Sequence, residues 1–424
     1  MSDLKEIYSL REKANKLEYN YLYNLEKQIN SNTERIKNLE EVGVINPPDP
    51  PDPSPTTKIY GYGKDTKGGE GGRIIYVTNL NNSGEGSLRW AIDQSGKRTI
   101  KSKIDGRINV TETLAIENGE VTIDFEDRNI TLSMEGTPNE FVLRISAPEV
   151  IVRFLTIRRS LQDVSSKNSD CVYIGRGHNI VLQNCSFSWA SDELIGINPE
   201  WADRDTKGVY NVTIQDCLFG FTYGDKGILI SGGASEISII RPVFASTKTR
   251  TPAISTPTDR DYSFDCYFEV INPLIYDTST GFTYQINKSN PEGTFYLNLI
   301  GGTEFQNEGG GYSRNMMTIK QPNLVYAYLE GNEGNFGTDW DLVQFGNGQS
   351  NINKPVPNEY RLSEPVDTPA LAQGIEILKA NELVEKLLPT SGNYLPQRDS
   401  EDERAINDII NKTQTYKDVN VFPY

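Results

Sequence analysis

The sequence predicts an all-β fold, a right-handed parallel β-helix, in which short strands coil around a single core. Short runs of β-branched and aromatic residues are separated by clusters of Gly, Asn, Asp and Ser, which is typical of many short strands. Successive runs begin 25 to 32 residues apart, and no helical pattern lies between them. The runs are Val121–Phe125, Val150–Phe154, Ile180–Asn184, Val212–Asp216, Ile237–Arg241, Phe264–Phe268, Phe295–Leu299 and Leu324–Tyr328.

Two of these runs continue into the same alternation, which indicates that the coils stack in register. Gln183–Phe187 and Gln215–Phe219 share Gln, then Asn or Asp, then Cys, and Phe two residues later. Because side chains alternate between the two faces of a strand, this register would place Cys185 above Cys217 inside the coil. A β-sandwich is the alternative fold, but it needs tight hairpins, and Asn-Gly or Asp-Gly pairs occur at only three positions.

The segment before the β-rich part has a helical pattern. Residues 2–42 contain neither Pro nor Gly, and their apolar residues recur at alternating three- and four-residue intervals. Residues 1–45 are therefore predicted to form a coiled coil, which needs partner helices to bury its narrow seam. The alternative is an amphipathic helix that lies on its own domain. Residues 46–57 contain six prolines and predict an extended, semi-rigid linker.

Residues 58–424 are predicted to form the β-helix together with the elements that cover its ends, since an open solenoid end exposes its core. Ser87 is the predicted N-cap of a short amphipathic helix over 86–92. Ser400 is the predicted N-cap of another helix, with Glu403 completing a capping box.

Composition excludes several classes of protein. The 424 residues include 42 Lys and Arg against 58 Asp and Glu, a net charge of −16, so no nucleic acid is predicted as a partner. The sequence shows no transmembrane helix, so no membrane insertion is predicted, and its first twenty residues lack the apolar run of a secretion signal. Four cysteines in so long a chain indicate buried thiols, not a disulfide framework or a CxxC zinc site.

Charged residues recur about one coil apart in the middle of the chain. The pair Asp192 and Glu193 is followed by Lys226 and then by Arg250. If the coils stack, these side chains converge on one strip of the surface.

Several collinear segments resemble the pectate lyase family, particularly its bacterial secreted branch. The resemblance covers roughly residues 60–411 and implies a parallel β-helix there. The segments are Gly69–Arg73, Tyr76–Leu80 and Gly84–Arg89 for the amino-terminal signature, Val150–Leu155 and Ser186–Glu193 for the central coils, and Ser391–Asp399 for the carboxy-terminal tail.

The resemblance implies β-elimination in an acidic polysaccharide, assisted by calcium. Asp170 lies where the family has a calcium-binding aspartate, and Asp192 or Glu193 lies where the next ligand falls. Calcium bound there would draw charge onto the substrate carboxylate. Lys226 is similar to the family's substrate-binding lysine, and Arg250 to the arginine usually assigned as the base.

The chain departs from the family pattern at several of these positions. Asn168 replaces a second aspartate, and Gly196 falls where a further calcium carboxylate is expected. A second arginine is absent, with Ala253 and Ser255 nearby, and the one histidine, His178, lies elsewhere and is interpreted as a turn residue. The calcium ligand set is therefore incomplete. Cleavage, binding without cleavage and a purely structural role all stay open.

Aromatic residues between these coils are candidates for stacking on sugar rings. Trp201, in the polar run Pro199–Arg204, and Tyr223 are predicted substrate contacts. Trp189 lies within a strand-like run, which favours packing in the core.

The predicted helical stalk, linker and β-helix, with no secretion signal, together resemble a bacteriophage tailspike. We therefore expect a virion tail protein, a homotrimer through residues 1–45, that binds a host acidic polysaccharide, with or without depolymerising it, and docks on other tail or baseplate proteins. One alternative is a secreted, extracellular calcium-dependent pectate lyase that acts on plant polysaccharide. The other is an inactive structural adhesin or baseplate component.

Overall fold

A computed structural model of the chain divides into two compact units, Met1–Pro55 and Thr56–Tyr424. The structure describes residues 58–135, 140–160, 169–200, 208–224, 226–247, 249–256, 264–277, 282–286, 293–305, 317–319, 325–334, 337–345 and 356–415. The predicted coiled coil of residues 1–45, its trimer and the linker 46–57 lie outside the described residues, so they stay predictions.

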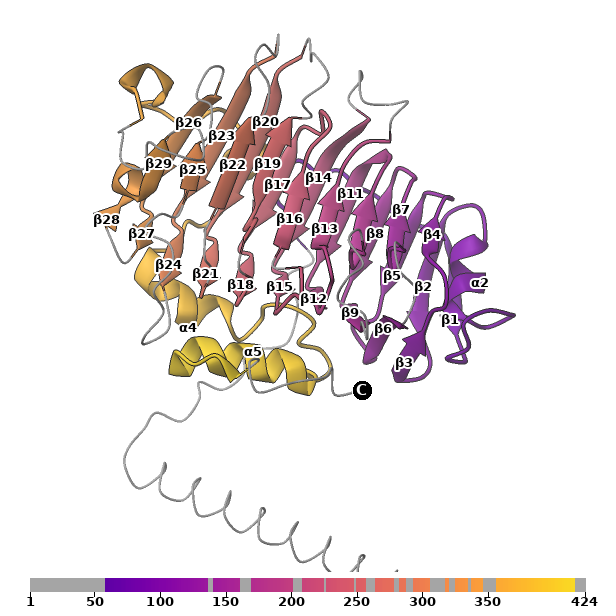
Figure 1. The fold of residues 1–424 in the computed structure, drawn as a ribbon. Coiled ribbons are helices and arrows are strands. Elements are labelled where there is room, and N and C mark those ends of the chain that lie inside the picture. The colour runs from indigo at the N-terminus through magenta and orange to yellow at the C-terminus, as the bar shows by residue number, and fades with distance from the viewer. Residues whose placement is uncertain are drawn as a thin grey trace, which may run out of the picture. The chain divides into compact units, whose positions relative to one another are not determined.

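The predicted parallel β-helix is confirmed for residues 58–415, where described. Three sheets hold 10, 10 and 9 strands, and each sheet takes every third strand of the chain over most of its length, as a right-handed coil of three strands per turn requires (Figure 1). Described neighbours pair in parallel except β27 and β28, which are antiparallel. The three sheets are called A, B and C below.

The strands have the following bounds. Sheet A contains β1 (Arg73–Val77), β2 (Arg98–Ser102), β5 (Val121–Asp124), β8 (Val150–Arg153), β11 (Gly177–Gln183), β14 (Val209–Gln215), β17 (Ile237–Ile240), β20 (Cys266–Ile271), β23 (Phe295–Ile300) and β26 (Val325–Glu330). Sheet B contains β3 (Gly106–Asn109), β6 (Ile130–Glu135), β9 (Thr156–Ser160), β12 (Ser186–Ser188), β15 (Leu218–Phe219), β18 (Val243–Ala245), β21 (Leu274–Tyr276), β24 (Thr303–Phe305), β27 (Glu333–Gly334) and β28 (Gly337–Thr338). Sheet C contains β4 (Leu114–Ile116), β7 (Leu143–Ile145), β10 (Val172–Ile174), β13 (Glu193–Ile197), β16 (Lys226–Ile230), β19 (Ala253–Thr256), β22 (Phe282–Ile286), β25 (Met317–Ile319) and β29 (Val343–Phe345).

The described helices are short apart from one. They are α2 (Leu88–Asp93), η2 (Asp339–Leu342), η3 (Asn358–Tyr360), α3 (Pro369–Ala372), η4 (Ala380–Glu382), α4 (Leu383–Leu387) and α5 (Ser400–Asn411). None of them has the length and apolar character needed to cross a bilayer.

The interior confirms the predicted register. Phe187 pairs with Phe219 across β12 and β15, and their rings stack 5.5 Å apart between centroids. Cys185 and Cys217, two residues before these rings, are both buried, and all four cysteines are free thiols. Stacked identical side chains pack successive coils against one another in one register, which fixes the pairing of the strands.

The structure confirms one of the two predicted N-cap residues and contradicts the other. Ser87 caps α2 as predicted, because its side chain accepts a hydrogen bond from the amide of Trp90. The predicted Ser400 cap of α5 is wrong: Asp399 is the N-cap, and its carboxylate accepts from the amide of Asp402 at 2.9 Å. A carboxylate satisfies this amide and also faces the positive end of the helix, so it takes the position.

Helices α4 and α5 lie along sheet B (Figure 1). Their apolar residues, including Leu383 and Ile409, form one cluster with Leu218, Val243 and Leu274 of the sheet. The carboxy-terminal part of the chain thereby covers an apolar face that these short strands would otherwise expose to water.

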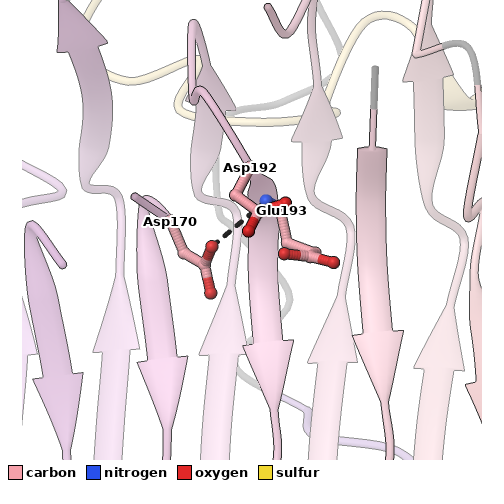
Figure 2. Close-up of side chains that lie close together, drawn as sticks. All are labelled: Asp170, Asp192 and Glu193. Atoms are coloured by element: carbon pink, nitrogen blue, oxygen red, sulfur yellow. Dashed lines mark hydrogen bonds between the residues drawn. The ribbon is translucent and has the colours of Figure 1, made fainter. Parts of the chain in front are cut away.

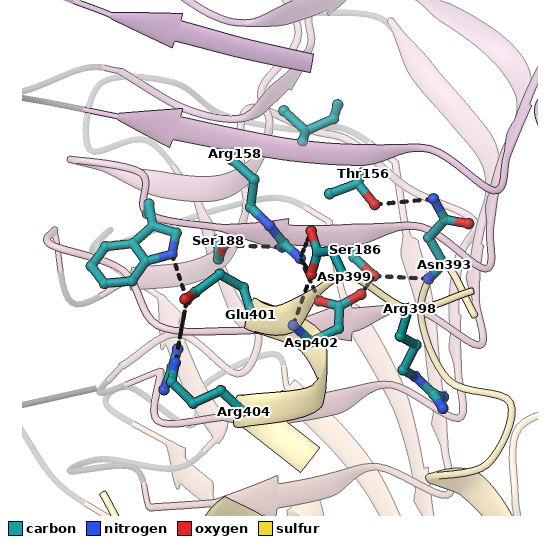
Figure 3. Close-up of polar contacts among 12 residues, drawn as sticks. Thr156, Arg158, Ser186, Ser188, Asn393, Arg398, Asp399, Glu401, Asp402 and Arg404 are labelled. Carbon is teal, nitrogen blue, oxygen red and sulfur yellow. Dashed lines mark hydrogen bonds and ion pairs between the residues drawn. The ribbon is translucent and has the colours of Figure 1, made fainter. Parts of the chain in front are cut away.

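A buried charge network fixes the start of α5 to sheet B (Figure 3). The side chain of Arg158 on β9 is 1% exposed and donates to Asp399 Oδ1 at 2.9 Å and Asp402 Oδ1 at 2.6 Å. Ser186 Oγ donates to the other oxygen of Asp402. Such a network stabilises only when each charge is matched, because an unmatched buried charge is costly.

Replacing Arg158 with methionine would leave the Asp402 carboxylate buried without its cation. We expect Arg158→Met to lower the free energy of unfolding by roughly 3–5 kcal/mol, measured by urea denaturation. The matched control is Arg144→Met, because Arg144 pairs with Glu117 at 2.8 Å on the exposed surface, where a loss below about 1 kcal/mol is expected. Equal, small losses in both variants would contradict a stabilising role for the Arg158 network.

Candidate functional site

A cleft of about 530 Å³ lies against sheet C and is lined by residues of five consecutive coils. Its wall combines charged and apolar side chains, which is the usual character of a ligand site. The lining residues are Phe141, Asp170, Tyr173, Asp192, Glu193, Gly196, Asn198, Lys226, Leu229 and Arg250.

Three carboxylates meet at one end of this cleft. Asp170 lies two residues before β10, Asp192 directly precedes β13, and Glu193 is the first residue of β13. Because β10 and β13 are parallel neighbours, these residues lie at the same edge of sheet C. Figure 2 shows the three side chains together, and each has an oxygen within 4.8 Å of the others. The amide of Glu193 donates to Asp170 Oδ1 at 3.1 Å, which orients that carboxylate.

Two cations from the next coils contact these carboxylates. Lys226, the first residue of β16, is paired in register with Glu193. Its ammonium group forms an ion pair with Asp192 and lies 3.9 Å from Glu193 Oε1. Arg250 follows on the next coil and forms an ion pair with Glu193. Its carbonyl accepts from the amide of Ile228 at 2.7 Å, which fixes the backbone beside β16.

Burial shifts the pKa of two of these groups. It raises the pKa of Asp170 well above its ordinary value, and the charge of Asp192 adds to this effect, although nearby cations oppose it. Burial also lowers the pKa of Arg250, whereas the charges of Asp192 and Asp170 raise it. The site therefore makes a charged carboxylate costly at Asp170 and makes the neutral form of Arg250 easier to reach than it is in water.

The carboxylates fit a hard cation such as calcium. Calcium takes about six to eight oxygen ligands, and three carboxylates can supply up to about six of them when each binds through both oxygens. Asp170, Asp192 and Glu193 also lie close enough to share one ion. Lys226 and Arg250 now hold two of the three carboxylates, so a cation would have to replace these ion pairs.

The turn that carries Asp192 is held from two sides. The indole of Trp189, which is fully buried, donates to Glu401 Oε2 of α5 at 3.0 Å. Thr222 Oγ1 on the following coil lies 2.8 Å from the carbonyl of Ala190 and 3.3 Å from that of Asp192. The carboxy-terminal helix therefore contacts the residue three positions before Asp192. The complete burial of Trp189 confirms its interpretation as core packing.

The other predicted residues lie outside the cleft or outside the described part of the chain. Trp201 and Asn168 belong to segments that the structure does not describe, so the predicted sugar contact of Trp201 stays a prediction. Tyr223 is not among the lining residues: its ring packs 5.3 Å from that of Trp189. Burial raises the pKa of Tyr223, and the negative charge of Glu401 raises it further. The interpretation of His178 as a turn residue is wrong: it belongs to β11 of sheet A, where its ring stacks on that of Tyr210.

Four lining residues were missed by sequence reasoning, and one of them is the polar Asn198. Phe141, Tyr173 and Leu229 form the apolar part of the wall. In β10, Val172 and Ile174 are buried in the core while Tyr173 between them is not, so alternation along this strand could have identified Tyr173. Phe141 lies before β7 and carries no such signal.

Gly196 lies in the cleft, as its predicted place in the ligand set requires. A Cβ atom there would come 2.6 Å from Asp170 Oδ2. The position therefore offers no carboxylate and leaves that space to Asp170.

No protein-family model matches the chain. Among curated proteins, it is 29% identical to a probable pectate lyase C of Aspergillus flavus over 244 residues, which are 57% of this chain and 52% of the relative. It is 25% identical to a probable pectate lyase C of Aspergillus fumigatus over 296 residues, 69% of this chain and 63% of the relative. The chain thus spans about half to two thirds of the length of these relatives.

Solved structures give the same result for the fold. A pectate lyase bound to a hexasaccharide matches with a TM-score of 0.52 and 13% identity, over 79% of this chain and 96% of that one. A pectate lyase variant from Xanthomonas campestris matches with a TM-score of 0.50 and 13% identity, over 80% and 100%. The chain therefore has the parallel β-helix fold found in pectate lyases.

Proposed function

We propose that the chain is a polysaccharide lyase of the pectate lyase type, which cleaves an acidic polysaccharide by β-elimination with the help of calcium. One observation carries the proposal: three carboxylates, a lysine and an arginine from successive coils meet in a single cleft. The similar curated proteins, named as probable pectate lyases, favour the same activity.

The alternative of a secreted lyase is preferred here over the tailspike. None of the similar proteins cited above is named as a virion component. We therefore propose that the protein acts outside the cell on plant or other uronate polymers. A trimer through residues 1–45 and docking on a virion tail are not needed for this activity.

The residues of the cleft have separate roles in the proposed reaction. Asp170, Asp192 and Glu193 would hold the calcium ion, which when bound withdraws charge from a sugar carboxylate and makes the adjacent C–H bond more acidic. Lys226 binds the sugar carboxylate. Arg250, in its neutral form, takes the proton from the carbon adjacent to the sugar carboxylate. Burial assists this step because it lowers the pKa of Arg250. The C–H electron pair becomes a C=C bond, the neighbouring C–O bond breaks, and the leaving oxygen takes a proton from water.

Binding without cleavage is the second candidate function, and the ion pairs favour it. In the structure Lys226 and Arg250 are held by Asp192 and Glu193. If these pairs persist when a sugar binds, no base is available. The cleft would then be a carbohydrate-binding surface.

The proposed reaction gives an unsaturated product that absorbs ultraviolet light. With calcium and an acidic polysaccharide we expect this absorbance to rise, and to stop rising on addition of a chelator. Arg250→Ala should lower kcat by about 10²- to 10⁴-fold, the usual contribution of a general base, with a smaller change in KM.

The control for this assay is Arg73→Ala, because Arg73 is exposed on β1, far along sheet A from the cleft. It should keep the activity of the unchanged chain. An Arg250→Ala variant as active as this control would refute the assigned base. Absence of product with all acidic polysaccharides would leave only the binding function.

Competition between Lys226 and calcium makes a second prediction. Lys226→Met removes a cation from Asp192, so we expect calcium to bind about tenfold more tightly, as measured by isothermal titration calorimetry. A hydrogen bond to a charged group contributes roughly 1.5–3 kcal/mol, and about 1.4 kcal/mol is tenfold in affinity. Asp192→Asn should weaken calcium binding. An unchanged or weaker affinity in Lys226→Met would mean that the ion lies elsewhere.

A further inference from the structure

We propose that the cleft selects a mixed polysaccharide, in which a uronate unit is followed by a neutral sugar with an apolar face, such as a 6-deoxyhexose. This inference rests on the proposed function, since it assumes that the cleft binds an acidic polysaccharide. It concerns the part of the cleft that the proposed reaction does not use.

The positive charge in the cleft is too small to bind many sugar carboxylates at once. Its lining contains two cations, Lys226 and Arg250, against three acidic side chains. Both cations already form ion pairs with those carboxylates. Ala253, on the next strand of sheet C, is buried and adds no charge. With one bound calcium ion, the ion and the two cations give four positive charges against three carboxylates, so the cleft matches about one sugar carboxylate. A polymer with a carboxylate on every ring would bring more negative charge than this.

An apolar surface lies further along the same strands. Tyr173 of β10, Gly196 of β13 and Leu229 of β16 are paired in register across the sheet and all line the cleft. Leu229 follows Lys226 by three residues, which is about 10 Å along β16. This distance exceeds the width of one sugar ring, so a ligand whose carboxylate lies at Lys226 contacts Leu229 with a different unit.

The tyrosine is held in place as a flat part of the wall. Its ring stacks on that of Phe141, with centroids 4.4 Å apart and planes 10° from parallel. Its hydroxyl donates to the carbonyl of Asn198 at 2.8 Å. The stack and the hydrogen bond hold the ring in one orientation. A sugar that packs against it therefore loses little free energy to the ordering of this side chain.

Gly196 keeps this surface open. A Cβ atom at this position would lie 3.3 Å from Tyr173 Cδ2 as well as 2.6 Å from Asp170 Oδ2. A carboxylate there would cover the tyrosine and add negative charge beside Asp170. Glycine leaves the tyrosine uncovered and adds no negative charge, so this position makes the cleft less charged and more apolar. Aromatic surface of this kind pairs with the C–H-rich face of an uncharged sugar.

The test compares two probes in the presence of calcium. One is a trimer of galacturonate, and the other is a tetrasaccharide in which galacturonate alternates with a 6-deoxyhexose. Binding to the full chain is measured by isothermal titration calorimetry. We expect the alternating probe to bind at least about fivefold more tightly, and Tyr173→Ala to remove most of this preference, as expected for one lost aromatic contact. The trimer should lose less than about twofold in affinity.

Tyr210→Ala is the matched control, because Tyr210 is also a half-buried, stacked tyrosine but lies on sheet A. It should leave both affinities unchanged. Should Tyr173→Ala fail to fold, as judged by circular dichroism, Leu229→Ser tests the same surface from the next coil.

Two results would overturn the inference: the trimer binding as tightly as the alternating probe, or Tyr173→Ala weakening both probes equally. Neither result affects the lyase assay. Conversely, preference for the alternating probe without any unsaturated product would refute the proposed cleavage and leave this inference standing.

Discussion

The register of parallel strands is the constraint on which the rest of this structure depends. Glu193 and Lys226 are 33 residues apart in sequence but are register partners in β13 and β16. A slip by one residue would turn every side chain of a strand to the opposite face, so the buried Phe187 and Phe219 would lose their stack while the cleft lost its charges. The core and the cleft are thus specified by the same pairing, and the apolar interior stabilises the arrangement of polar groups at the surface.

The carboxy-terminal segment extends this constraint to the side of the solenoid. A buried ion-pair network joins Arg158 to Asp399 and Asp402, which are more than 240 residues away in sequence. In the same segment, Glu401 accepts a hydrogen bond from the indole of Trp189. Trp189 begins the turn that leads to Asp192. The helix α5 therefore covers an apolar face and also restrains the loop that carries two carboxylates of the cleft. A ligand site needs such support, because its geometry is no better fixed than the residues behind it.

Sequence reasoning found the fold through one strand of each coil. The eight predicted runs all correspond to strands of sheet A, which are four to seven residues long in that region, whereas several strands of sheet B, such as Leu218–Phe219, are too short to show periodicity. The charged residues were identified because their chemistry is visible in the sequence, and stacking brought them together. Alternation along β10 turns Tyr173 away from the core, but it does not tell whether an outward aromatic residue borders a cleft, and Phe141 precedes β7 and belongs to no strand. The Asp399 cap was assigned one residue late because serine is also a common N-cap residue. The choice of Asp399 depends on its hydrogen bond to the amide of Asp402 and its ion pair with Arg158, which the sequence does not show.

The cleft differs from a simple anion site in a way that links both proposals. Its cations are held by its own carboxylates, and Gly196 leaves room for Asp170 beside the ring of Tyr173. The most direct test is a crystal structure of the full chain soaked with terbium, whose anomalous scattering locates a calcium-like ion. We predict one strong peak bounded by Asp170, Asp192 and Glu193, with Lys226 moved away from Asp192. Intact ion pairs and an ion-free cleft at saturating terbium would contradict the account.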